Sequence, residues 1–139
     1  MQIKVMDRVS ARKYSFNPNI FKTAMISIYS HNWTPNTIKI NENGVAKVLF
    51  LKFDDTETEN YGMTKKDAKN VAKFIKEIGE EHDILIVHCD AGISRSSGVA
   101  AAIMKYLYND DTPIFNNPLY QPNMRCYRLV LNALYDDNN

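Results

Sequence analysis

The 139-residue chain has little of what would direct it to a membrane, a nucleic acid or a secretory route. No apolar run approaches the roughly 20 residues that a helix needs to span a bilayer, and the first dozen residues are polar and charged, unlike a targeting segment. With 17 basic and 16 acidic side chains, the net charge of +1 gives no general reason to bind nucleic acid or an anionic membrane. We therefore expect a cytoplasmic protein.

Cysteine and histidine are also scarce. The two cysteines, Cys89 and Cys126, make no disulfide framework, and the three histidines are not spaced with them as zinc ligands. We expect no metal and no cofactor. The length and the apolar content of 45% fit one globular domain over residues 1–139, without internal repeats. The oligomeric state is left open, with a monomer as the default.

The most informative stretch runs from His88 to Gly98 and reads HCDAGISRSSG. It follows the buried-type run ILIV and precedes a run with helical spacing, which predicts a loop between a strand and a helix N-terminus. Successive backbone N–H groups in such a loop can surround a phosphate, and Gly92 accepts the positive φ angle that the curl requires. The predicted phosphate-binding residues are Asp90, Ala91, Gly92, Ile93, Ser94 and Arg95.

Three side chains of this stretch have the chemistry of covalent phosphate transfer. Cys89 is the candidate nucleophile, because donors that attract phosphate also favour a thiolate over a thiol. The guanidinium of Arg95 can hold two phosphate oxygens at once. Ser96 can donate its hydroxyl to the sulfur when the thiolate leaves. We interpret His88 as a hydrogen-bonded structural residue, and Cys126 as core packing.

Predicted strands and helices alternate along the rest of the chain. The expected strands are a short edge strand within residues 1–7, a core strand at 23–29, a central strand at 46–53 and the strand at 84–87, with a small strand or brace at Ile38 and Ile40. The expected helices cover residues 8–14, 64–78, 96–108 and 124–134, with Thr64 and Asp67 as a capping pair and Gly79 as a stop. This order predicts an α/β fold, a mainly parallel central sheet flanked by helices.

The expulsion of an alkoxide or phenoxide from a phosphate ester needs an acid that protonates the leaving oxygen. Asp54 and Asp55 directly follow a predicted strand, so they should share the rim of the sheet with Cys89. Adjacent residues that leave a strand point in opposite directions, and only one of the two can reach the site. The residues alone leave open which one does.

HCDAGISRS resembles the signature of the cysteine-dependent protein tyrosine phosphatases, and its GxSRS ending resembles the dual-specificity branch. The resemblance covers about residues 23–134, and the first twenty residues carry none of it. It implies the phosphatase fold, Asp55 as general acid and base, and Asn123 in the segment QPNMRCYRL as a structural support. It also implies phosphoprotein or phosphopeptide substrates carrying phosphotyrosine, with phosphoserine and phosphothreonine as further candidates, hydrolysed through a phosphocysteine intermediate.

Departures from the family narrow this expectation. The chain lacks the tyrosine-bearing recognition loop of the large tyrosine-specific phosphatases, so we expect a shallow site. It also lacks the loop lysines of phosphoinositide-directed relatives, and carries acidic Asp90, Asp54, Glu57 and Glu59 instead. Three alternatives stay open: a non-catalytic phosphate-binding module, an arsenate reductase or sulfurtransferase, and an RNA 5′-phosphatase. The near-neutral charge speaks against RNA, and the lack of a nearby second cysteine speaks against the reductase.

Overall fold

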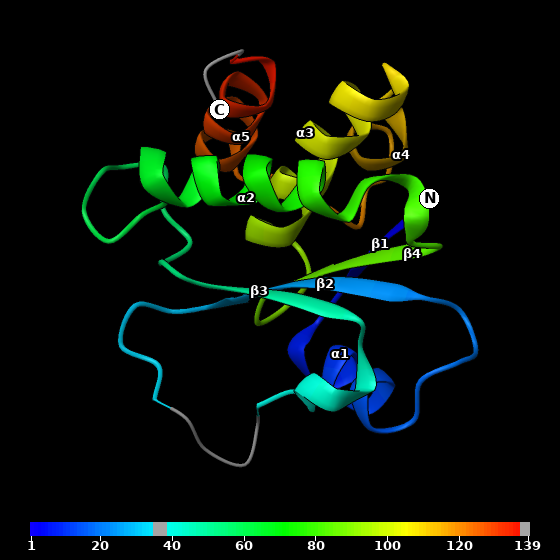
Figure 1. Ribbon diagram of the computed structural model, residues 1–139. Helices are drawn as coiled ribbons and strands as arrows, with labels where there is room; N and C mark the ends of the chain where they lie inside the picture. The colour runs from blue at the N-terminus through cyan, green and yellow to red at the C-terminus, as the bar shows by residue number, and fades with distance from the viewer. Residues whose placement is uncertain (35–38, 137–139) are drawn as a thin grey trace.

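The computed structural model describes residues 1–34 and 39–136, and Figure 1 shows a sheet with helices on both faces. The four strands are β1 (Gln2–Met6), β2 (Thr23–Tyr29), β3 (Lys47–Lys52) and β4 (Ile84–His88). Their order is β1-β4-β2-β3, and every pair is parallel. The predicted α/β class and parallel sheet are therefore confirmed. Because all strands run the same way, their carboxyl ends meet along one rim.

The two inner strands, β2 and β4, are buried along their whole length, as their continuous apolar runs predict. β1 lies at one edge, also as predicted. The prediction of a central strand at residues 46–53 is wrong in position, because β3 is the opposite edge strand. Lys47 and Lys52 at its two ends are exposed, which is typical of an edge.

Helices cover both faces of the sheet (Figure 1). α1 (Arg8–Phe16) lies alone, whereas α2 (Lys65–Ile78), α3 (Arg95–Tyr108), α4 (Thr112–Phe115) and α5 (Met124–Tyr135) lie together. Short 3₁₀ turns cover Glu42–Gly44 and Gly79–Glu81. α4 is a short helix, with Pro113 in its first turn, that the sequence did not predict. Among the described residues no helix is both long and apolar enough to cross a bilayer.

The ends of α2 follow the sequence prediction closely. The Thr64 side chain accepts a hydrogen bond from the backbone N–H of Asp67, and the Asp67 carboxylate accepts one from Thr64, which completes the capping box. Gly79 ends the helix with φ of +52°. At Ile38 and Ile40 the sequence predicted a small strand or a brace, and within the described residues 39–46 no strand forms. Ile40 packs as a single buried residue in the core below the sheet, and Ile38 lies outside the described residues.

α3 is the central helix of the larger layer and is buried on all sides from Arg95 to Met104. Small residues permit this close packing. A Cβ atom on Gly98 would lie 2.4 Å from the carbonyl oxygen of Asn123, just before α5. The helical spacing of the sequence predicts that Leu107 points inward, but Leu107 is exposed, since the burial of α3 ends after Met104. The stretch that follows β4 is thus held between a buried strand and a buried helix.

Candidate active site

The signature loop (residues 89–95) leaves β4 at His88 and leads into α3 at Arg95. Gly92 has φ of +69°, the left-handed conformation predicted for it. Its missing side chain also permits a close backbone contact. A Cβ at this position would lie 2.7 Å from the backbone nitrogen of Asp7, so the glycine is needed because the β1–α1 junction packs directly against the loop.

Cys89 is 2% exposed, and its sulfur lies 3.1 Å from the hydroxyl oxygen of buried Ser96. The pairing expected from the spacing of these two residues is present. The hydroxyl is therefore in a position to donate to a sulfur anion.

The Arg95 guanidinium is 5% exposed and anchored on one side. Its Nη1 donates to the carbonyl oxygen of Phe53 at 2.8 Å and to the Ser30 hydroxyl at 3.5 Å. Its Nη2 donates to the Asp90 carboxylate at 3.1 Å. The Nε is buried and has no hydrogen-bond partner among the described residues. A buried N–H group of a cation that has no hydrogen-bond partner favours the binding of an anion.

Cys89, Arg95 and Asp55 line one cavity of about 270 Å³. It is bordered by Asp55, Cys89, Asp90, Ala91, Ile93, Ser94, Arg95 and Gln121. The shared rim predicted for Asp55 and Cys89 is therefore present, although 34 positions separate them in the chain. Within the signature loop only Gly92 does not contribute to the wall.

Asp54 and Asp55 leave β3 in different directions, as predicted for adjacent residues. The Asp54 carboxylate accepts hydrogen bonds from the backbone nitrogen and the Nδ1 of His31, at 2.9 and 2.8 Å. These bonds hold the pKa of Asp54 below its ordinary value, which makes it a poor proton donor. Asp55 Oδ1 accepts instead from the Ser94 hydroxyl at 2.7 Å and from the Asn123 amide at 2.9 Å.

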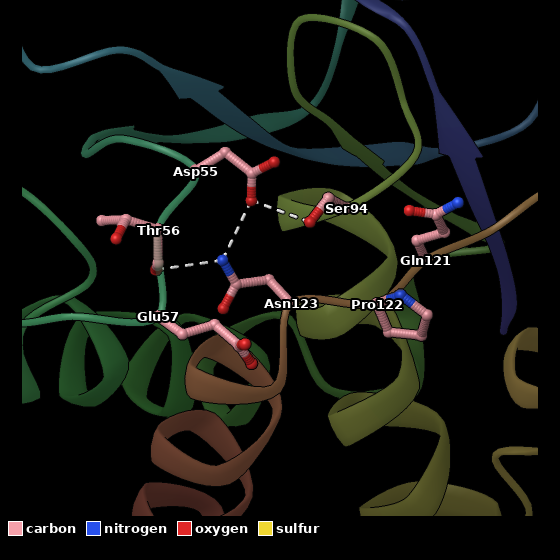
Figure 2. A pocket seen from close by; sticks show the side chains of 7 residues that line it. All are labelled: Asp55, Thr56, Glu57, Ser94, Gln121, Pro122 and Asn123. Atoms are coloured by element: carbon pink, nitrogen blue, oxygen red, sulfur yellow. Dashed lines mark hydrogen bonds between the residues drawn. The ribbon is translucent and has the colours of Figure 1, made fainter.

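Figure 2 shows Asp55 directed toward Ser94 and Asn123, with its second oxygen pointing away from both donors. Since both hydrogen bonds reach Oδ1, Oδ2 is left to carry a proton toward a ligand. Of the two aspartates, Asp55 is the one that lines the Cys89 cavity. Its assignment as the acid, which came from resemblance, stays a prediction that this geometry supports.

Asn123 connects the Asp loop (residues 54–62) with the start of α5. Its Nδ2 donates to Asp55 and to the carbonyl oxygen of Thr56, and its Oδ1 accepts from the backbone nitrogen of Cys126 as the N-cap. Its backbone nitrogen also donates to the carbonyl oxygen of Ser94. The sequence suggested a support beneath the signature loop, and the side-chain amide in fact holds the aspartate.

A second cavity of about 470 Å³ adjoins the first (Figure 2). The two share Asp55, Ser94 and Gln121, and the second is lined further by Thr56, Glu57, Pro122 and Asn123. It extends the site along the Asp loop toward the N-terminus of α5. The carboxylate of Glu57 lies at its border and accepts a hydrogen bond from the backbone of Met124.

His88 is fully buried at the end of β4. Its ring nitrogens contact the Ser27 hydroxyl and the carbonyl oxygen of Cys89. Burial lowers the pKa of His88 to about 4, so the ring is neutral at physiological pH. This matches its interpretation as a structural imidazole. Cys126 is also buried, and burial raises the pKa of its thiol, as expected for a packing residue.

Three aromatic residues, His31, Trp33 and Tyr61, take part in ring stacking. Tyr61 stacks on His31 with ring centroids 4.0 Å apart, and its φ of +59° is unusual for a residue with a side chain. Trp33 stacks on the buried ring of Tyr29. These rings do not border the cavity that contains Cys89.

The sequence missed Arg8, whose Nη1 lies 3.3 Å from the Asp90 carboxylate. Arg8 follows β1 and Asp90 follows β4, and these strands are neighbours in the sheet. The rule that placed Asp55 at the rim would have found this pair if β1 had been assigned beside β4. No group of three or more potential ligands for a metal is present in the described part of the chain.

No protein-family model matches the chain, and no curated protein matches its sequence. Solved structures match it well. Human DUSP28 superposes with a TM-score of 0.67 at 15% identity, over 95% of this chain and 90% of that one. A human tyrosine phosphatase-like serine/threonine/tyrosine-interacting protein gives a TM-score of 0.66 at 23% identity, over 94% and 89%. PTPMT1 in complex with PI(5)P gives 0.61 at 15%, over 96% and 90%.

These matches extend over nearly the whole chain, although the first twenty residues carry none of the sequence resemblance. The share of the chain left unmatched is smaller than its first twenty residues, so the N-terminal segment cannot lie wholly outside the common fold. The packing of the β1–α1 junction on Gly92 explains why this segment is part of the fold even though it carries no motif.

Proposed function

We propose that this chain, which has the fold of the cysteine-dependent, dual-specificity-like phosphatases, hydrolyses phosphate monoesters through a phosphocysteine intermediate. The observation that carries the proposal is the single cavity lined by Cys89, Arg95 and Asp55. A nucleophile, a cationic clamp and a proton donor are the three groups that this reaction needs.

In the first half of the reaction, the substrate phosphate lies in the signature loop against backbone N–H groups and the Arg95 guanidinium. The Cys89 thiolate attacks phosphorus, so that a sulfur–phosphorus bond forms while the bond to the leaving oxygen breaks. Asp55 gives its proton to that oxygen. The alcohol or phenol then departs, and the carboxylate of Asp55 remains ionised.

In the second half, water attacks the phosphocysteine and Asp55 accepts the proton that the water loses. The sulfur–phosphorus bond breaks, inorganic phosphate forms and the thiolate is restored. The Ser96 hydroxyl, 3.1 Å from the sulfur, stabilises the departing thiolate by a hydrogen bond. Asp55 ends the cycle protonated, ready for the next substrate.

The substrate class that fits best is a phosphorylated peptide or protein. The carboxylates of Asp90 and Glu57 repel additional phosphates, whereas the cavity beyond Asp55 has room for a neighbouring residue with a basic side chain. PTPMT1 was crystallised with PI(5)P, so inositol lipids are the most informative substrates to compare with phosphopeptides. We expect phosphotyrosine peptides, and phosphoserine and phosphothreonine peptides after them, to be hydrolysed faster than inositol lipids.

A non-catalytic phosphate-binding module is the second candidate, because one structural neighbour is named a phosphatase-like interacting protein. The presence of Cys89 and Asp55 at one cavity, with the Ser96 hydroxyl 3.1 Å from the Cys89 sulfur, favours an enzyme. A binding module would retain phosphopeptide without releasing phosphate.

The test is the hydrolysis of a chromogenic aryl phosphate, in reductant and chelator, by the wild type, Cys89→Ser and Asp55→Asn. We expect vanadate-sensitive activity that Cys89→Ser abolishes and Asp55→Asn lowers by about 10²- to 10⁴-fold. Asp54→Asn is the matched control, because it makes the same change one residue away on a carboxylate held by His31. Full activity in Cys89→Ser would refute the mechanism, and a damaging Asp54→Asn beside a harmless Asp55→Asn would move the acid to Asp54.

A further inference from the structure

The carboxylate of Asp90 lies between two arginines at the mouth of the proposed phosphate site. Its Oδ2 accepts from Arg95 Nη2 at 3.1 Å and from the Ser30 hydroxyl at 3.4 Å, and its Oδ1 accepts from Arg8 Nη1 at 3.3 Å. The Asp90 side chain is 41% exposed, whereas that of Arg95 is 6% exposed. The anion is therefore the movable partner of the pair.

The guanidinium of Arg95 offers one fork to a ligand. Nη1 is held by the carbonyl oxygen of Phe53 at 2.8 Å, which fixes the orientation of the plane. The remaining fork consists of Nε and Nη2. Nε is buried without a partner in the described structure, and Nη2 is occupied by Asp90. Nη2 carries two N–H groups and already donates to Asp90, so a phosphate that binds both nitrogens of this fork competes with the carboxylate for Nη2.

Arg8 is placed to keep the displaced carboxylate outside the site. It begins α1, its backbone nitrogen donates to the carbonyl oxygen of Asp90 at 3.2 Å, and its Nη1 already contacts Asp90 Oδ1. Its Nε is buried with no partner among the described residues, so Arg8 can donate a second hydrogen bond to the carboxylate. The packing of Gly92 against Asp7 holds the start of α1 in place.

We propose that Asp90 is an internal competitor for the phosphate at Arg95, and that Arg8 receives its carboxylate when an oxyanion binds. The inference rests on the proposed phosphate site and deepens it. Asp90 and Arg8 are thus positioning residues that set the affinity of the site for an anion. A phosphate dianion, which can occupy the whole fork, displaces the carboxylate more readily than a singly charged anion does.

The experiment measures tungstate binding by titration calorimetry at fixed ionic strength, so that no turnover is needed. Asp90→Asn should lower the dissociation constant by about fivefold, the upper range for an ion pair with one half-exposed partner. Arg8→Gln should raise the dissociation constant by a similar factor. Glu80→Gln is the control, because it makes the same charge change as Asp90→Asn in the turn before β4, at the opposite end of that strand.

The double variant separates this exchange from simple attraction by Arg8. If Arg8 acts through Asp90, Arg8→Gln has little effect once Asp90 is Asn. An equal loss in both backgrounds would mean that Arg8 meets the anion directly, and would overturn its assigned role. Unchanged or weaker tungstate binding by Asp90→Asn would overturn the competition itself.

Two further outcomes keep this inference distinct from the proposed function. If the binding pattern appears but no variant hydrolyses an aryl phosphate, the exchange stands and the hydrolase proposal fails. If hydrolysis is present but Asp90→Asn leaves tungstate affinity unchanged, only the exchange fails. Thermal unfolding checks each variant, and an Arg8→Gln variant that binds tungstate like the wild type contradicts the exchange even if Asp90→Asn does not fold.

Discussion

The signature loop and the Asp loop supply the two halves of the proposed chemistry and are built in opposite ways. Cys89, Arg95 and Ser96 are all at most 5% exposed and lie between a buried strand and a buried helix. The Asp loop is mostly exposed, lacks regular structure, and is held by side-chain contacts to residues distant in the chain. The reactive sulfur therefore depends on the core, whereas the acid depends on a few hydrogen bonds.

This difference predicts how each loop responds to substitution. A change in the signature loop should disturb chemistry and folding together, because its side chains are part of the packed interior. A change in the contacts of the Asp loop should reduce the rate while most of the stability remains. The predictions below test that division, beginning with the largest effect.

Replacing Arg95 with Lys should lower kcat/KM by on the order of 10³-fold, because a lysine keeps the charge but cannot bind two oxygens in a fixed plane. Steady-state kinetics with an aryl phosphate measures the effect. Arg128→Lys, on the exposed side of α5, is the matched control and should leave kcat/KM unchanged. A loss of less than tenfold in Arg95→Lys would show that charge alone suffices.

Low pH should destabilise the fold through His88, which is buried at the end of β4 just before the signature loop. The pKa of His88 is about 4 in the folded protein because burial disfavours the charged ring, whereas the unfolded chain protonates near 6.5. Between these values the unfolded chain binds more protons, so the stability falls as the pH drops from 6.5 to 4, by about 3 kcal/mol in all. Chemical denaturation at several pH values measures the slope. His88→Gln should remove most of it, and an unchanged slope in that variant would contradict this account.

Substitutions of Asn123 can separate its role as the N-cap of α5 from its hydrogen bond to Asp55. Asn123→Ala loses both and should lower the unfolding free energy by about 2 kcal/mol and kcat by about 10- to 100-fold. Asn123→Ser keeps an oxygen for the Cys126 backbone but loses the donor to Asp55. It should therefore recover most of the stability and little of the rate. If the serine variant recovers the rate as well, the amide does not position the acid.

The smallest effect is expected at Ser94, whose hydroxyl is the second donor to Asp55. Ser94→Ala leaves the Asn123 bond in place, so kcat should fall by only about threefold. The thermal midpoint should not change measurably. Combined with Asn123→Ser, the loss should exceed the product of the two single losses, because no side-chain donor then remains on Asp55. A loss of kcat in the double variant that equals the product of the two single losses would mean that Ser94 and Asn123 act independently.

The parts of the fold that the sequence predicts are those that local chemistry decides. The capping box at Thr64 and the glycine stop at residue 79 depend on neighbours a few positions away. The buried strands at residues 23–29 and 84–88 follow from mainly apolar runs. The signature loop combines a strand end, a glycine and a helix start in one short segment, which is why its shape could be anticipated in detail.

Predictions that depend on long-range arrangement were less successful. The apolar composition of residues 46–53 resembles that of a central strand, and only the terminal lysines point to an edge. The contacts of Arg8 with Asp90, and of Asn123 with Asp55, join residues 82 and 68 positions apart. Such contacts require the order of the strands and the path of each side chain. Strand geometry narrowed the candidate acid to Asp54 or Asp55, and the family resemblance favoured Asp55.

The bond between the Asn123 amide and the Asp55 carboxylate has a consequence for the timing of activity during synthesis. Cys89, Arg95 and Asp55 have all been translated by residue 95, together with the Ser94 hydroxyl, but the second side-chain donor to Asp55 arrives only with Asn123, where the last helix begins. A nascent chain would thus contain Cys89 well before Asp55 is fully held. If the chain is the hydrolase proposed above, its activity would be incomplete until the C-terminal helix has docked.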